Sequence, residues 1–210
     1  MKVTKYTHSC LLIEKDGHRV LIDPGNYTTA KHKLTGLGHL NAVLYTHKHS
    51  DHLDESILPQ LKSAGIAIYG NSEVAGLIGQ DCQVVQSGRT FRVASLEIMP
   101  HDLPHCLLAD GTAGPMNTGY IFDNKLFHSG DGVEVSDVQI QILAAPMVGP
   151  SISFYQAFEL IQATQAKQFI PMHGDGYFKV DVREFEDKAN RNGLLSAKVL
   201  ALQDGQSIEL

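Results

Sequence analysis

A cluster of metal-ligand side chains directly after a short apolar segment most constrains what this chain can fold into. Residues 42–45 read Ala-Val-Leu-Tyr, as expected of a buried strand, and His47, His49, Asp51 and His52 follow. A loop that leaves a sheet is held by it and can present side chains in a fixed arrangement. Imidazole nitrogens and carboxylate oxygens bind zinc and similar divalent ions at about 2.0–2.2 Å. The cluster therefore predicts a metal site at one edge of a β-sheet.

Three later segments repeat this pattern of an apolar run followed by a potential ligand. His101 directly follows one run, with His105 four residues further on. Asp131 lies in a Gly-Asp-Gly turn after a second run, and His173 directly follows a third. A site for two metal ions needs about seven protein donors, of which the first cluster supplies four. The remaining donors are expected at these strand ends.

The order of apolar segments predicts two β-rich halves, each with its own helices. Strands are expected at 3–6, 10–14, 19–22, 42–45, 66–69, 83–85, 90–93, 96–99, 118–122, 125–128, 139–143, 169–172, 197–200 and near 208, and helices at 56–64, 72–78, 153–167 and 180–192. Asp-Gly at 16–17 and Asp-Asn at 123–124 indicate hairpin turns, and 26–40 reads as an irregular loop. Two facing sheets with helices outside would bury both sheet surfaces.

Composition narrows the class of protein. A chain of 210 residues with 43% hydrophobic content suits one domain spanning 1–210, and its net charge of −6 disfavours broad nucleic-acid binding. The three cysteines form no Cys-x-x-Cys pair, and neither a signal peptide nor a membrane-spanning run is recognisable. We therefore expect a cytoplasmic protein without a membrane partner. The oligomeric state is not readable, and a homo-oligomer is compatible with the sequence.

These motifs, in this order, resemble the metallo-β-lactamase superfamily. The resemblance runs through His-x-His-x-Asp-His at 47–52, His101, Ser-Gly-Asp at 129–131 and Met-His-Gly at 172–174, and it covers nearly the whole chain. Within the superfamily the chain looks most like the small, compact branch of metal-dependent hydrolases that includes L-ascorbate-6-phosphate lactonase. The resemblance implies an α+β fold, a four-layer αββα sandwich of two mixed sheets, with the site at one edge.

The resemblance also implies a role for each ligand position. The first metal would be bound by His47, His49 and His101, and the second by Asp51, His52 and His173. Asp131 would bridge both metals. Family members commonly place the ligand straight after the strand, so we expect His101 to bind and His105 to support the ligands or face the substrate. Besides binding metal, Asp51 could orient the hydroxide or relay a proton.

Such a site predicts hydrolysis. Two divalent ions about 3.5–4 Å apart can share a hydroxide and lower the pKa of water to about 7. Zinc is the default ion for mixed histidine and aspartate donors, with manganese or iron as alternatives. We expect a small-molecule ester or lactone as substrate, with His8, Tyr177 and Lys179 near the pocket. A phosphodiesterase or nuclease on the same metals, and a metal-binding module without catalysis, stay open.

Overall fold

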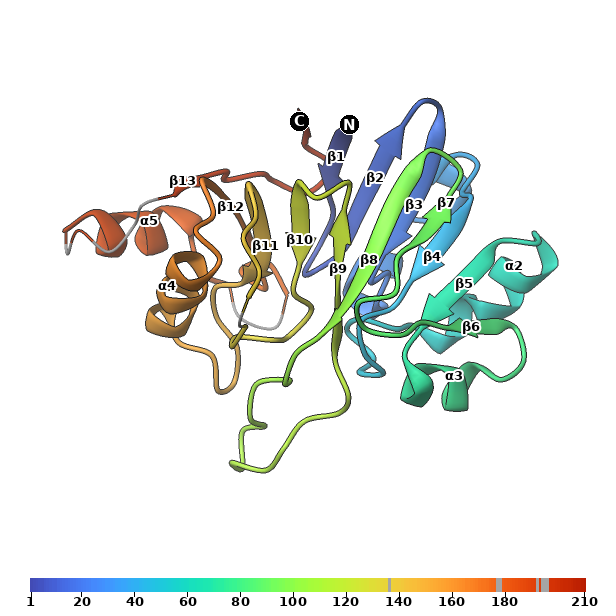
Figure 1. The fold of residues 1–210 in the computed structure, drawn as a ribbon, viewed down its shortest axis with the longest axis horizontal. Coiled ribbons are helices and arrows are strands. Elements are labelled where there is room, and N and C mark those ends of the chain that lie inside the picture. Colours follow the sequence, from blue (N-terminus) through green and yellow to red (C-terminus); the bar gives the residue numbers. More distant parts are fainter. Residues whose placement is uncertain (136, 177–178, 192, 194–196) are drawn as a thin grey trace.

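The fold is a sandwich of two β-sheets, seen in a computed structural model that describes residues 1–135, 137–176, 179–191, 193 and 197–210 (Figure 1). The described residues form two sheets of seven strands. The first sheet runs in the order β14 (Ser207–Glu209), β1 (Lys2–Lys5), β2 (Leu11–Lys15), β3 (His18–Ile22), β4 (Ala42–Leu44), β5 (Ala67–Gly70), β6 (Cys82–Val84). The second runs β13 (Lys198–Val199), β12 (Gln168–Met172), β11 (Ile142–Pro146), β10 (Leu126–His128), β9 (Thr118–Phe122), β8 (Leu96–Asp102), β7 (Phe91–Val93).

Helices cover the outer face of each sheet. In Figure 1, α2 (Leu58–Ser63) and α3 (Ser72–Ile78) lie on one side of the sandwich, and α4 (Phe154–Ala163) and α5 (Val182–Arg191) lie on the other. This is the αββα arrangement, which confirms the predicted fold class. None of the helices among the described residues has the length and apolar character needed to cross a membrane.

Alternation along the strands explains why the sheets face each other. On β2, Leu11 and Ile13 belong to the core between the sheets, whereas Leu12 packs with the outer layer of the first sheet. On β12, Ile170 faces the inner core and Phe169 packs under α4 and α5. Successive side chains of a strand point to opposite faces, so both faces of each sheet are buried.

One expected loop and one expected strand differ from the structure. The expected loop at 26–40 contains a short helix, α1 (Asn26–Thr29), and a 3-10 turn, η1 (Leu34–Leu37), because Leu34 and Leu37 are buried against the outer layer of the first sheet. The strand expected at 139–143 lies at Ile142–Pro146, since its pairing with β10 and β12 begins at Ile142.

The helices near the C-terminus are shorter than expected. The helix expected over 153–167 begins after Ser153, whose side chain forms a capping box with Gln156, and ends at Ala163. The chain then turns at Gln165, which has a positive φ of 53°. The helix expected over 180–192 is α5, Val182–Arg191, and residue 192 lies outside the described residues. The helices expected at 56–64 and 72–78 correspond to η2 (Glu55–Ile57) with α2, and to α3 with Asn71 as its N-cap.

Strand direction positions the potential ligands. β3 and β4 are parallel, and so are β10, β11 and β12. The carboxyl ends of parallel strands meet at one edge of a sheet, so loops far apart in sequence lie together there. The ends of these five strands carry most of the site described next.

Candidate metal centre

Side chains from both sheets gather at one edge of the sandwich. The first sheet contributes His8 from the β1–β2 loop, Asp23 after β3, and His47, His49, Asp51 and His52 after β4. The second contributes His105 after β8, Asp131 after β10 and His173 after β12. Within each of the two histidine groups described below, the potential ligand atoms lie within 4.8 Å of one another.

The first group consists of His47, His49 and His105. The ring centroid of His105 lies 4.7 Å from that of His47 and 4.9 Å from that of His49. Thr46 Oγ1 donates to Asp23, so it accepts the Nδ1 proton of His47 over 3.0 Å. His105 Nδ1 donates to the Cys106 carbonyl over 2.6 Å.

Because the ring proton lies on Nδ1 in both His47 and His105, the Nε2 atom of each has a free lone pair. Among the described residues, neither His47 Nε2 nor His105 Nε2 has a hydrogen-bond partner, although both atoms are buried. Buried polar atoms are normally paired, and a metal-binding histidine typically donates its other ring N–H to the protein. The first group therefore fits a divalent cation.

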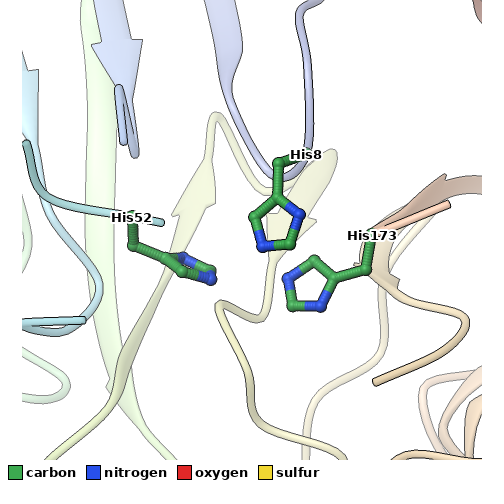
Figure 2. Close-up of side chains that lie close together, drawn as sticks. All are labelled: His8, His52 and His173. Carbon is green, nitrogen blue, oxygen red and sulfur yellow. The ribbon is translucent and has the colours of Figure 1, made fainter. Parts of the chain in front are cut away.

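The second group consists of His8, His52 and His173, which converge from three loops (Figure 2). His52 Nδ1 donates to Asp23 Oδ2 over 2.7 Å, and both side chains are fully buried. This bond turns His52 Nε2 toward Asp131 Oδ1, which is 3.0 Å away. His173 Nε2 lies 3.0 Å from the same oxygen, yet neither of these two atoms has a partner in hydrogen-bond geometry among the described residues.

Asp131 lies between the two groups. Its Oδ1 faces His52 and His173, and its Oδ2 lies 3.6 Å from His105 Nε2. Asn117 holds the turn, because its Oδ1 accepts from the Asp131 N–H over 3.1 Å and its Nδ2 donates to the Ser129 carbonyl over 3.0 Å. A carboxylate in this position can contact cations in both groups.

The electrostatics of the site favour positive charge at its centre. Burial, together with His52, holds the pKa of His47 well below its ordinary value, so His47 is neutral at pH 7. Burial alone would lower the pKa of His52, but the Asp131 and Asp23 carboxylates raise it well above its usual range. The pKa of Asp131 is held well below normal by His173 and His52, against the opposing effect of burial. Ionised Asp131 therefore stabilises any cation placed beside it.

Asp51 belongs to none of the grouped ligand sets among the described residues. Its carboxylate is a third exposed and accepts from His8 Nε2 over 3.0 Å. The His8 ring stacks on His173 with centroids 3.8 Å apart, and burial lowers the pKa of His8 to about 4. His8 is therefore neutral at pH 7 and positions Asp51 at the pocket.

A partly buried ion pair between Lys5 and Asp175 fixes His8 in turn. The backbone of His8 has a positive φ of 66°, and its N–H donates to Asp175 Oδ1 over 2.8 Å. Asp175 Oδ2 pairs with Lys5 Nζ over 2.8 Å, and the Lys5 side chain is only 5% exposed. The loop after β12 is thereby tied to strand β1 of the other sheet.

His101 does not lie with the ligands that sequence reasoning grouped it with. Strand β8 continues to Asp102, so His101 pairs with Gly119 inside the sheet instead of following the strand end. Its ring packs edge-on against Phe127, with centroids 5.9 Å apart. His105, expected to support the ligands or face the substrate, occupies the position beyond the strand end that was expected for His101.

Two contributors are not identified by sequence reasoning. They are Asp23, which accepts from His52, and Asn117, which holds the turn of Asp131. The available signal for Asp23 is an acidic residue at the end of a strand followed by Pro-Gly. A Cβ at Gly25 would lie 1.8 Å from the Asp51 carbonyl oxygen, so the backbone carrying Asp51 approaches this turn too closely for any side chain.

A pocket of about 460 Å³ opens onto the centre. Its described lining comprises His8, Asn26, Tyr27, His49, Ser50, Asp51, His105–Ala109, Asp131, Gly149–Ser151 and His173. His8 thus faces the cavity as expected. Lys179 is exposed and is not part of this lining, while Tyr177 lies outside the described residues.

Comparison with known proteins shows the family to which the chain belongs. The sequence model of a Beta-lactamase superfamily domain matches residues 2–173, so the chain belongs to the metallo-β-lactamase superfamily. A UPF0173 metal-dependent hydrolase of Methanopyrus kandleri is 30% identical over 237 residues, covering 100% of both chains. The protein is accordingly a metal-dependent hydrolase of that superfamily, as the sequence predicted.

Solved structures share the fold along nearly the whole chain. A metallo hydrolase from the archaeon Ignicoccus hospitalis superimposes with a TM-score of 0.77 at 22% identity, covering 99% of this chain and 97% of that one. An isothiocyanate hydrolase from Delia radicum gut bacteria gives a TM-score of 0.77 at 21% identity, covering 100% and 99%. At this identity the likeness establishes the fold.

Proposed function

We propose that the protein is a binuclear hydrolase of small-molecule esters or lactones. The observation that carries the proposal is the presence of two clusters of histidine side chains, one on either side of Asp131. His47, His49 and His105 would hold one divalent ion, His52 and His173 a second, with Asp131 between them. Zinc is the ion we propose, because imidazole and carboxylate donors suit it.

The chain's own residues provide orientation and proton transfer. When bound, a pair of divalent cations supplies an acidified water as nucleophile and an electrophile for a carbonyl oxygen. We propose that Asp51 relays the proton that this water loses. Its carboxylate lines the pocket and is oriented by His8. Although burial acts against it, the His8 hydrogen bond and the nearby His52 keep the pKa of Asp51 below its ordinary value. Asp51 is therefore ionised at neutral pH and can take up a proton only transiently, as a relay, because a lowered pKa makes a carboxylate a weaker base.

The metal assignment is tested by a matched pair of histidine variants. His105→Ala is expected to reduce bound zinc to one ion or fewer per chain, because it removes one of three imidazoles around the first ion. His101→Ala, four residues away and packed on Phe127, should retain two. Plasma emission spectrometry on dialysed protein measures both. Loss of metal from the His101 variant with full loading of the His105 variant would reverse the assignment.

The reaction class is tested by turnover of the zinc-loaded protein on matched chromogenic substrates. Esters, thioesters and lactones should be hydrolysed, and bis-p-nitrophenyl phosphate should be a poor substrate. An alkyl isothiocyanate belongs in the panel because one structural neighbour is named as an isothiocyanate hydrolase. Activity confined to the phosphodiester would point to the alternative phosphodiesterase, and two tightly bound ions without any turnover would point to a non-catalytic metal-binding module.

A further inference from the structure

We propose that this pocket selects an uncharged substrate carrying an apolar group, which packs against a wall formed by Cys106–Ala109 and Pro150. The inference rests on the proposed function, because it names the substrate class of the same site. The wall rises directly beside His105 and Asp131, so a group bound there lies next to the proposed reaction centre.

The wall is apolar and anchored. Leu107 is 57% exposed although it is a large hydrophobic residue, and it lines the pocket together with Leu108 and Pro150. Beneath it, the buried Cys106 packs with Val133 and Ile152 in a small core. An exposed leucine beside a cavity contributes binding energy when a ligand removes it from water.

The two segments of the wall are tied to each other. The Ser151 hydroxyl donates to the Leu107 carbonyl, which links the β8–β9 connection to the loop before α4. The Cys106 N–H donates to the Asp131 carbonyl over 2.9 Å, so the wall is also tied to the turn that carries Asp131. A wall held by these hydrogen bonds at Cys106 and Leu107 can discriminate between ligands without first having to become ordered.

The charges around the wall disfavour an anionic group on the part of the substrate that packs there. None of the described lining residues is lysine or arginine, and the residues outside the described ranges include neither type in the sequence. The nearby Lys48 is paired with Glu73 over 3.1 Å, and Lys5 is paired with Asp175. The carboxylates of Asp51 and Asp131 lie at the floor, where the proposed cations would offset their charge, so the wall itself carries no charged side chain. A second anionic group on the substrate would therefore find no protein counter-charge at the wall.

Pocket size agrees with a small molecule. Ligand pockets of this kind generally measure about 300–1,000 Å³, and this one measures about 460 Å³. An acyl or aryl group of a few carbon atoms would fill the wall side while the reacting carbonyl faces the histidines.

Binding of hydroxamic acids tests the wall independently of turnover. The probes are acetohydroxamic acid, hexanohydroxamic acid and the monohydroxamate of adipic acid, titrated calorimetrically into the zinc-loaded full chain. Each added methylene should tighten the Kd by about two- to fourfold, since transfer of a methylene out of water is favourable. The adipic probe, which ends in a carboxylate, should bind about tenfold more weakly than the hexanoyl probe.

Leu107→Lys should abolish the benefit of the hexanoyl chain and tighten binding of the adipic probe. Leu77→Lys is the matched control, because Leu77 is 42% exposed on α3 and is not part of the pocket lining. Circular dichroism verifies that both variants fold. Equal Kd values for the acetyl and hexanoyl probes, tighter binding of the adipic probe to the unaltered protein, or no binding of any probe would overturn the inference.

These outcomes separate the two proposals. Chain-length dependence without turnover of any ester or lactone would refute the hydrolytic assignment and leave the apolar wall standing. Turnover with no chain-length dependence and no effect of Leu107→Lys would refute the wall and leave the hydrolase standing.

Discussion

The direction of each imidazole is set by the atoms behind it. Asp23 accepts from His52 Nδ1 and also from the backbone and hydroxyl of Thr46, whose hydroxyl in turn accepts from His47. One fully buried carboxylate therefore orients a histidine in each proposed ion site. Residues that orient metal ligands in this way commonly influence affinity as strongly as 10–100-fold.

Asp23→Asn is predicted to weaken zinc binding by about 10–100-fold, because an amide cannot accept as strongly from His52 and Thr46 together. Competition against a chromophoric chelator measures the affinity. The control is Asp81→Asn, since Asp81 is an exposed residue paired with Lys62 at the surface. Equal zinc affinity in the two variants would show that Asp23 does not orient the site.

For single residues, the sequence predicts which side chains can bind metal better than it predicts where each of them lies in the fold. The run from His47 to His52 is recognisable because four ligand types follow one apolar segment. The choice between His101 and His105 is not, because it depends on how far β8 extends. That length is set by pairing with β9 as far as Thr118, which is a tertiary property.

Among the elements, the turn after β10 restricts the choice of amino acid most strongly. Gly130 has a positive φ of 58°, and a Cβ there would lie 2.2 Å from Asn117 Oδ1 and 2.7 Å from Thr46 Cβ. The turn therefore combines an unfavourable backbone conformation for other residues with contact on two sides. Asp131 follows directly, so displacement of the turn displaces the carboxylate shared by both proposed ions.

Gly130→Ala is predicted to destabilise the protein by several kcal/mol and to remove at least one zinc ion. Gly17→Ala isolates the backbone contribution, because Gly17 has a φ of 79° and an added methyl group would meet nothing within 4 Å. The control should cost only about 1–2 kcal/mol and retain full metal. Urea unfolding and plasma emission measure the two effects. Equal costs for the two variants would contradict the clash at residue 130.

Elements with strong local signals are predictable, and those fixed by packing are not. The helix Ser72–Ile78 has a capping asparagine and a terminal glycine, and its predicted bounds match. In the segment 26–40 the leucines at 34, 37 and 40 recur every three residues, but this pattern is too short to predict a helix. Its short helical turns therefore become visible only where Leu34 and Leu37 meet the sheet.

For the whole molecule, bound metal should raise thermal stability. A ligand that binds only the folded state stabilises it by about 2.7 kcal/mol at a concentration one hundred times its Kd. For a chain of this size we expect the midpoint of thermal unfolding to rise by roughly 5–10 °C. Calorimetry with added zinc, against a chelator such as EDTA, measures the shift.

The histidine variants supply the controls for this thermal experiment. His101→Ala should show the same zinc-dependent rise as the unaltered protein, and His105→Ala a smaller one. An identical melting temperature with zinc and with chelator would contradict metal binding by the folded state. The fold as a whole is predictable because two β-rich halves in series admit few ways of burying both sheet faces.

The position of the ligands at the seam between the sheets has a mechanical consequence. His47, His49 and His52 are carried by one slab of the sandwich, and His105, Asp131 and His173 by the other. Neither sheet alone supplies all of the proposed ligands, so bound cations would link the two sheets to each other. Any sliding of one slab past the other would loosen the grip on the ions, even when every ligand is intact. We therefore expect residues such as Ile170, in the core between the sheets, to influence metal retention through the packing of the two sheets.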